Sequence, residues 1–289
     1  MISIRTRWIL VGLGFGLLFG LVQAEDGVQL SYRYPDGSTV VYKNRETVDL
    51  NMGVIRSSLQ TEYRSEERKL DVIDGKQSME FKMVRLAEST KIGGQLIPRE
   101  VPTLMEGQAV WFKLDDRGNV TGFETGELSD LSYAEEKALK PILSNLKLGV
   151  PALYPELPDH PVSVGDTWET DREFTADDVD GVVGKTTIKA KYTVKRKLHR
   201  KGRLCYELLE ISETTTNAIV SFGTMTVLVS GSGESKGKIE FDTEQGLIIK
   251  YDIRGKLKVD TTPVTKQSMP PTQAQMTVGV IRQLEDIRN

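Results

Sequence analysis

Residues 80–90 read EFKMVRLAEST, and residues 205–215 read CYELLEISETT. Aromatic, aliphatic and hydroxyl-bearing residues fall at matching positions in the two stretches. Just before and within the first stretch, Met79, Phe81 and Met83 alternate with polar residues. A spacing of two residues sends alternate side chains to opposite faces of a β-sheet. Both stretches are therefore predicted to be strands with one face turned toward a core.

These strands belong to a longer correspondence between the two halves of the chain. Tyr34–Val40 matches Val162–Trp168, and the strand–turn–strand region 111–123 matches 239–251. Internal similarity of this kind indicates a duplicated structural unit, although any two β-meanders share some features. Glycine-containing turn dipeptides separate the strands, as in hairpins. We therefore expect a mainly β fold of two similar antiparallel β-meander units, each a curved sheet or half-barrel.

One helix is predicted within this β pattern, at residues 132–146. Ser132 and Glu135 have the spacing of a capping box, and Pro141 predicts a kink. The expected organisation is a signal peptide at residues 1–24, a first β unit with the helix at 25–150, a Pro-rich linker at 151–161 and a second β unit at 162–289.

The amino-terminal residues have the pattern of a secretory signal peptide. Arg5 and Arg7 precede an apolar run from Trp8 to Val22, and small residues at Val22 and Ala24 fit signal peptidase. No cysteine stands near this junction, so a lipoprotein anchor is not expected. Later apolar runs are shorter than the ~20 residues that cross a bilayer. We expect cleavage near Ala24, a periplasmic or secreted product, and no stable membrane span afterwards.

The overall charge argues against a nucleic-acid partner. The chain has 38 Lys plus Arg and 41 Asp plus Glu, whereas nucleic-acid binding needs concentrated positive charge. The single cysteine, Cys205, lies in the apolar run Leu204–Ile211 and is expected to be buried as a small hydrophobic residue.

Residues suited to catalysis are scarce. The only histidines, His160 and His199, lie in a Pro-rich stretch and beside Arg200-Lys201, with no evident partner in the sequence. Ser144–Lys147 and Ser235–Lys238 fit S-x-x-K, but the companion motifs of penicillin-recognising enzymes are missing. We therefore expect no enzymatic activity, no cofactor and no structural or catalytic metal.

Two loop-like stretches have features of ion-binding sites. Asp177–Gly181 resembles the start of an EF-hand loop, yet Ala176 and Thr187 would occupy its first and twelfth ligand positions. A solvated acidic turn is favoured, and weak calcium binding at Asp177–Asp180 stays open. Ser230–Glu234 reads SGSGE, for which a flexible hairpin turn is predicted rather than an anion cradle.

Residues 160–168 read HPVSVGDTW and follow the stretch 153–158. With this motif the chain resembles an uncharacterised family of exported bacterial β-rich proteins, a domain of unknown function. The antiparallel meanders also resemble, at the level of fold, the half-barrels of periplasmic lipoprotein carriers and outer-membrane lipoprotein receptors. The resemblance implies an exported β-rich protein and no particular activity.

Two functions are compatible with these features. The leading hypothesis is a non-enzymatic envelope protein whose β units curl around an apolar concavity that binds a hydrophobic or lipid-like ligand. The ligand-binding candidates are Phe81, Trp111, Trp168 and Tyr206. The alternative is a structural or adaptor protein in which two sheets pack on each other without a cavity, and whose outer strands bind an envelope protein.

Overall fold

The computed structural model describes residues 27–53, 55–92, 95–98, 107–125, 132, 147, 149–179, 182–200, 202–222, 225–264 and 272–289. The strands of this part of the chain are β1 (Thr39–Met52), β2 (Ile55–Ile73), β3 (Lys76–Ile92), β4 (Gln95–Pro98), β5 (Ala109–Leu114), β6 (Val120–Thr125), β7 (Thr167–Val179), β8 (Val182–Arg200), β9 (Arg203–Phe222), β10 (Met225–Asp242), β11 (Leu247–Pro263) and β12 (Thr272–Arg288).

All the strands belong to one 12-stranded antiparallel sheet in the order β6-β5-β3-β2-β1-β12-β11-β10-β9-β8-β7, with β4 paired to β3. The predicted mainly β, antiparallel meander fold is confirmed. The two meanders are joined because β1 pairs with β12 from Thr39 and Arg288 to Asn51 and Gln275. They therefore form neighbouring parts of a single open sheet, and their origin by duplication stays a prediction.

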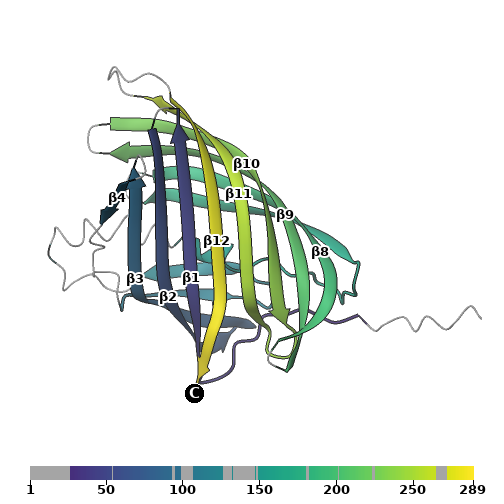
Figure 1. Ribbon diagram of the computed structural model, residues 1–289. Coiled ribbons are helices and arrows are strands. Elements are labelled where there is room, and N and C mark those ends of the chain that lie inside the picture. Colours follow the sequence, from purple (N-terminus) through teal and green to yellow (C-terminus); the bar gives the residue numbers. More distant parts are fainter. Residues whose placement is uncertain are drawn as a thin grey trace, which may run out of the picture.

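The sheet is strongly curled, and the second meander turns behind β1 and β12 (Figure 1). Glycines on the concave side of β10 allow β11 to approach closely. A Cβ at Gly237 would lie 2.9 Å from Cβ of Ile253, and one at Gly233 would collide with the Lys256 carbonyl oxygen and Leu257. The SGSGE stretch thus lies inside β10 and pairs on both sides. The predicted hairpin turn there is wrong.

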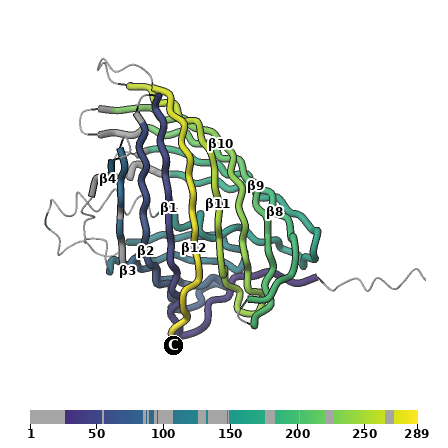
Figure 2. The backbone as a smooth tube through the Cα atoms, viewed as in Figure 1, coloured from purple at the N-terminus to yellow at the C-terminus, as the bar shows by residue number. Residues whose placement is uncertain are grey.

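Two segments outside the strands cover one half of the concave face. Residues 27–38 cross one end of the curled sheet (Figure 2) and meet residues 149–162 through the bridge between Val28 and Val162. We call these two segments the plug. Tyr154 and Leu157 of the plug are 0% and 1% exposed within the hydrophobic core. The predicted Pro-rich linker therefore also fills the core.

The plug is tied to the β5–β6 turn by backbone contacts. The Leu157 amide donates to the Arg117 carbonyl oxygen at 2.8 Å, and the Tyr32 amide donates to the Asp116 carbonyl oxygen at 2.8 Å. Gly118 has a φ of 97°, and a Cβ there would lie 2.7 Å from the Pro155 carbonyl oxygen. A side chain at this turn would therefore displace the plug.

Helical structure is minor in the described part of the chain, where residue 147 and residues 149–152 are helical. The helix predicted at 132–146 lies outside the described residues except for Ser132, as does the signal peptide at 1–24. No helix among the described residues is long and apolar enough to span a bilayer. Asp177 and Asp178 end β7, whereas Asp180 is outside the described part, so calcium binding there stays open.

Candidate functional site: a half-open apolar trough

The concave face is divided by a layer of buried polar side chains at the edge of the plug. Arg282 and Glu67 form an ion pair of 2.7 Å, and both side chains are 0% exposed. Glu67 also accepts hydrogen bonds from the hydroxyls of Tyr34 at 2.5 Å and Tyr154 at 2.8 Å. Charge and hydrogen bonding therefore saturate the carboxylate, as a buried carboxylate requires.

Arg282 is less well satisfied than Glu67. Its guanidinium lies 3.7 Å from the centre of the Tyr42 ring, but its Nε and Nη1 groups have no hydrogen-bond partner among the described residues. The Tyr42 hydroxyl and the Asn44 Oδ1 atom are likewise buried and unpartnered. An unsatisfied buried polar group costs about 1–3 kcal/mol. Several such atoms therefore gather around one side chain.

Burial also shifts the ionisation of this layer. It raises the pKa of Tyr42 to about 12, although the neighbouring Arg282 charge opposes the shift. It raises the pKa of Tyr34 and Tyr154 well above the usual value, and the charge of Glu67 adds to both shifts. These hydroxyls therefore stay protonated over the physiological pH range.

Two further carboxyl groups flank the polar layer. Glu46 accepts a hydrogen bond from the Tyr63 hydroxyl at 2.9 Å. Glu210, 4% exposed, accepts from Ser212 at 3.1 Å and from the Tyr251 hydroxyl at 3.3 Å. Burial raises the pKa of both carboxyls, and the hydrogen bonds only partly oppose this. Both groups are pushed toward their neutral form.

Beyond the polar layer, toward the ends of the long strands, the concave face is apolar. In an antiparallel sheet, directly opposed residues point to the same face. Val48 opposes Val278, and Leu257 opposes Met276. All four face the concave side, are half-buried and are not among the described residues that form or pack against the hydrophobic core cluster. The same surface includes Leu50, Leu59, Ile253, Val259 and Val280.

The facing part of the second meander is small and uncharged. Its inward positions beyond the polar layer are Ile188 and Thr186 on β8, Thr214 and Thr216 on β9, and Gly231 and Gly233 on β10, with their same-face neighbours. Beyond Glu46 on β1, the described inward-facing side chains of β1, β2 and β8 to β12 are uncharged as far as the far strand ends. We call this surface the trough.

The outer face of the same strands carries charged, exposed side chains. Lys256, Lys258 and Arg254 on β11 alternate with the trough residues and are exposed. On β1, Lys43 and Arg45 are exposed in the same way. Beyond the polar layer and Glu46, the described charged side chains of β1 and β11 lie on the convex side, so the trough is not simply a continuation of the solvated surface.

The aromatic residues predicted from the sequence as ligand contacts lie elsewhere. Phe81 and Tyr206 are each 1% exposed and belong to the core cluster. Trp168 is 8% exposed and stacks on Tyr192 with ring centres 5.1 Å apart. Trp111 alternates with inward-facing residues on β5 and so faces the outer side. Phe81, Tyr206 and Trp168 are therefore part of the core. A ligand-binding role for all four residues stays a prediction.

The residues considered for reactive chemistry are isolated. Cys205 is buried as a free thiol, and burial raises the pKa of its thiol to about 11. His160 is exposed and contacts Asp159, and His199 is exposed on β8. Among the described residues, no group of three or more His, Cys, Asp or Glu side chains is placed to hold a metal ion.

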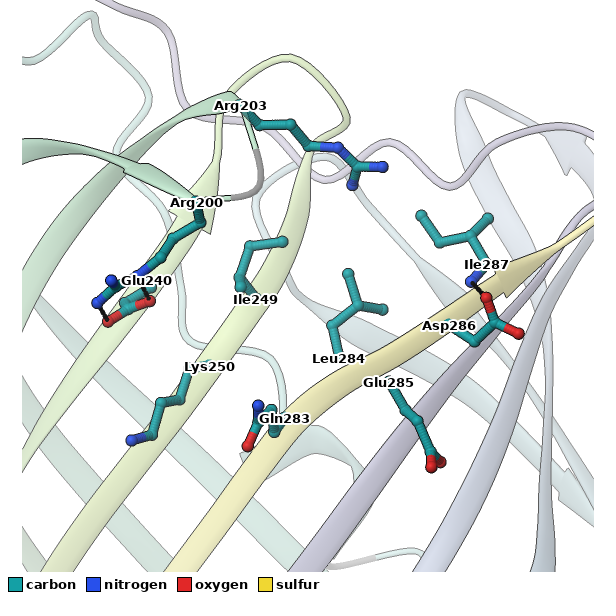
Figure 3. A pocket seen from close by; sticks show the side chains of 10 residues that line it. All are labelled: Arg200, Arg203, Glu240, Ile249, Lys250, Gln283, Leu284, Glu285, Asp286 and Ile287. Atoms are coloured by element: carbon teal, nitrogen blue, oxygen red, sulfur yellow. Dashed lines mark hydrogen bonds and ion pairs between the residues drawn. The ribbon is translucent and has the colours of Figure 1, made fainter.

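A separate hollow of about 460 Å³ opens on the outer face where β11 and β12 diverge (Figure 3). β11 and β12 are paired from Lys250 and Gln283 onward. The start of β11, residues 247–249, and the end of β12, residues 284–288, are not paired with each other. Arg200 and Glu240 at its rim form a two-point ion pair with both N–O distances at 2.7 Å. The opposite charges of Arg200 and Glu240 therefore balance each other.

Comparison with known proteins leaves the chain without an assigned family. No protein-family model matches it, and no curated protein matches it. Among solved structures, it is similar to lipovitellin in a structure concerned with lipid–protein interactions, with a TM-score of 0.48 and 10% identity. That match covers 88% of this chain and 26% of the lipovitellin chain, so this chain spans about a quarter of that protein.

A second match is the OccK2 (OpdF) protein of Pseudomonas aeruginosa in complex with glucuronate. It has a TM-score of 0.14 and 7% identity, and covers 93% of this chain and 99% of that one. At these TM-scores neither likeness carries an argument about function. The predicted resemblance to exported β-rich proteins of unknown function stays a prediction, and the function must be argued from this chain's own residues.

Proposed function

We propose that this chain is a non-enzymatic binding protein that shelters a hydrophobic, lipid-like ligand in the trough. The supporting observation is the half-buried state of inward-facing residues such as Val48, Val278 and Leu257, on a surface whose described side chains beyond Glu46 are uncharged on these strands. In the plugged half, the equivalent side chains of the same strands are buried, as at Tyr42 and Tyr251.

The physical reason is the cost of apolar surface in water. Each Å² of apolar area that stays in contact with water, instead of being buried, forgoes about 25 cal/mol of stabilising free energy. Large apolar concavities typically bind ligands. The trough offers aliphatic side chains on β1, β11 and β12, and a wall of Thr, Ser and Gly on β9 and β10. Such a surface contacts a flexible acyl chain without selecting a particular shape.

Export is part of this proposal. It rests on the signal-peptide pattern at residues 1–24, which would place the mature protein where exported lipids and acylated peptides move between membranes. A periplasmic or secreted binding protein needs no catalytic group, which agrees with the scarcity of catalytic motifs in the sequence.

A different observation favours the adaptor function. Val183, Ile219 and Leu228 oppose one another across β8, β9 and β10 on the outer face. Their exposed fractions are 47%, 44% and 42%, and an exposed apolar row suits a protein partner. In this case the partner would dock on the convex side and the trough would have no ligand.

The test compares two neighbouring substitutions on β12. Val278→Glu places a carboxylate in the trough, whereas Thr277→Glu places it on the outer face. Binding is measured with N-phenyl-1-naphthylamine, an uncharged apolar probe whose fluorescence increases in apolar surroundings. We expect Val278→Glu to weaken binding at least about tenfold, because a buried unpaired charge is costly.

Thr277→Glu should bind the probe as the wild type does. Equal affinities in all three proteins, or no probe binding by the wild type, would contradict the proposed function. A folded far-UV spectrum for both variants excludes unfolding as the cause of a loss.

A further inference from the structure

We propose that Arg282, Tyr42 and Asn44 form a binding site for the uncharged, oxygen-bearing head of a single-chain amphiphile whose hydrocarbon tail lies in the trough. Fatty alcohols and monoacylglycerols belong to this chemical class. We call these three residues the head site. The inference rests on the proposed function, because it supplies the polar end of the same ligand.

The first argument is the set of unpartnered atoms. An arginine has five N–H donors, and Arg282 directs Nη2 to Glu67 at 2.7 Å while Nε and Nη1 have no partner. Within the described part of the chain, the Tyr42 hydroxyl and Asn44 Oδ1 also lack a hydrogen-bond partner, and all three side chains are 0% exposed. Buried polar atoms in native proteins are nearly always hydrogen-bonded. This cluster therefore has unused capacity for both a hydrogen-bond acceptor and a donor.

The second argument is position. Asn44 and Arg282 oppose each other across β1 and β12. The next inward-facing pair along these strands is Glu46 and Val280, and Val280 in turn opposes Ile253 on β11. All three are half-buried; Glu46 flanks the polar layer, and Val280 and Ile253 begin the trough. The head site thus lies at the inner end of the apolar surface, where one end of a bound chain would stop.

The third argument is charge. Glu67 already neutralises Arg282, and Glu67 and Arg282 are both fully buried. An anionic head would add an unbalanced negative charge to this buried layer, in which the Glu67 charge already balances that of Arg282. Buried unbalanced charge is strongly disfavoured. The residues that surround the head site therefore favour a neutral head.

The donor and acceptor pattern refines the class further. Arg282 and the Tyr42 hydroxyl can donate to an oxygen of the ligand, and Asn44 Oδ1 can accept from a hydroxyl of the ligand. A hydroxyl group meets both requirements with one oxygen, whereas a hydrocarbon meets neither. An ordered internal water would also satisfy these atoms, so the test must separate water from a ligand head.

The experiment measures displacement of N-phenyl-1-naphthylamine from the full mature chain by three ligands of equal chain length: dodecan-1-ol, dodecyl sulfate and dodecane. Wild type is compared with Tyr42→Phe, which removes only the unpartnered hydroxyl. Tyr32→Phe is the matched control, because it removes a buried hydroxyl that already donates to the Pro155 carbonyl oxygen at 3.0 Å within the plug.

We expect wild type to bind dodecan-1-ol more tightly than dodecyl sulfate. Tyr42→Phe should weaken the binding of dodecan-1-ol about fivefold, which corresponds to the loss of one hydrogen bond. The binding of dodecane should be unchanged. Tyr32→Phe should change the binding of neither ligand. Thermal unfolding of Tyr42→Phe should be close to that of wild type, because the lost hydroxyl makes no hydrogen bond of normal distance and angle with the described residues.

Two results would overturn the head site while leaving the trough intact. One is tighter binding of dodecyl sulfate than of dodecan-1-ol, which would indicate an anion site. The other is an equal effect of Tyr42→Phe on dodecan-1-ol and dodecane, which would indicate that only an internal water uses these atoms. Failure of every ligand and of the probe to bind would overturn the proposed function and the head site with it.

Discussion

The plugged half and the trough lie on the same strands and the same face, yet they differ in how well that face is covered. In the plugged half, Tyr154 meets Tyr32 and Phe112 with ring centres 5.7 Å and 5.8 Å apart, and all three residues are buried. In the trough, Val48 and Val278 are aliphatic and remain half-buried. A single curled sheet can therefore carry its hydrophobic core at one end and keep an apolar surface available at the other.

The largest expected difference between the two regions is in stability. Phe81→Ala in the plugged half should lower the free energy of unfolding by about 3–5 kcal/mol, as for buried aromatic truncations. Leu257→Ala in the trough should cost about 1 kcal/mol, because a half-buried side chain loses less apolar area. Urea unfolding of the apo protein measures both. Similar losses at the two positions would mean that the trough is packed as tightly as the core.

A smaller effect should appear in the pH dependence of stability. Because burial raises the folded-state pKa of Glu210, the folded protein holds this proton more strongly than the unfolded chain does. The contribution is present below the unfolded value of 4.5 and is lost as the pH rises through the folded pKa. Glu210→Gln should therefore be more stable than wild type near pH 8, and this advantage should disappear at acidic pH.

Chemical unfolding at a series of pH values checks this prediction. Ser212 donates to one Glu210 oxygen and Tyr251 to the other. In the variant one of these hydroxyls can donate to the glutamine oxygen and the other can accept from its NH2 group, so position 210 keeps two hydrogen bonds. Parallel stability curves for wild type and Glu210→Gln would contradict the expected ionisation of this carboxyl.

The strands were predictable because their alternation is local. The strands predicted at residues 80–90 and 205–215 lie within β3 (Lys76–Ile92) and β9 (Arg203–Phe222). The SGSGE stretch was misinterpreted because glycine and serine favour turns in the absence of tertiary contacts. Here those glycines make room for β11 on the concave side of β10, which depends on a strand that follows later in the chain.

The site was harder to predict than the fold. Phe81 and Tyr206 were expected to face a ligand, and they do face the concave side, but the plug covers that end of it. The position of the plug depends on contacts between residues far apart in sequence, such as Val28 with Val162. The prolines near Tyr154 predicted a linker, and nothing in that pattern indicated that Tyr154 is buried in the core.

A signal for the polar layer was nevertheless present in the sequence. Val278, Val280, Arg282 and Leu284 share one face of a strand by their spacing. An arginine in such an apolar series must be paired when it is buried. Its partner, Glu67, lies 215 residues away, so the pair itself could not be identified without the fold.

The most direct measurement is photocrosslinking with dodecan-1-ol that carries a diazirine near the end of its chain, followed by peptide mass spectrometry. The proposed function predicts labelling of inward-facing residues of the trough, above all Leu257, Met276 and Val278, and loss of this labelling in Val278→Glu. Labelling confined to Val183, Ile219 and Leu228 on the outer face, or no specific labelling, would contradict it.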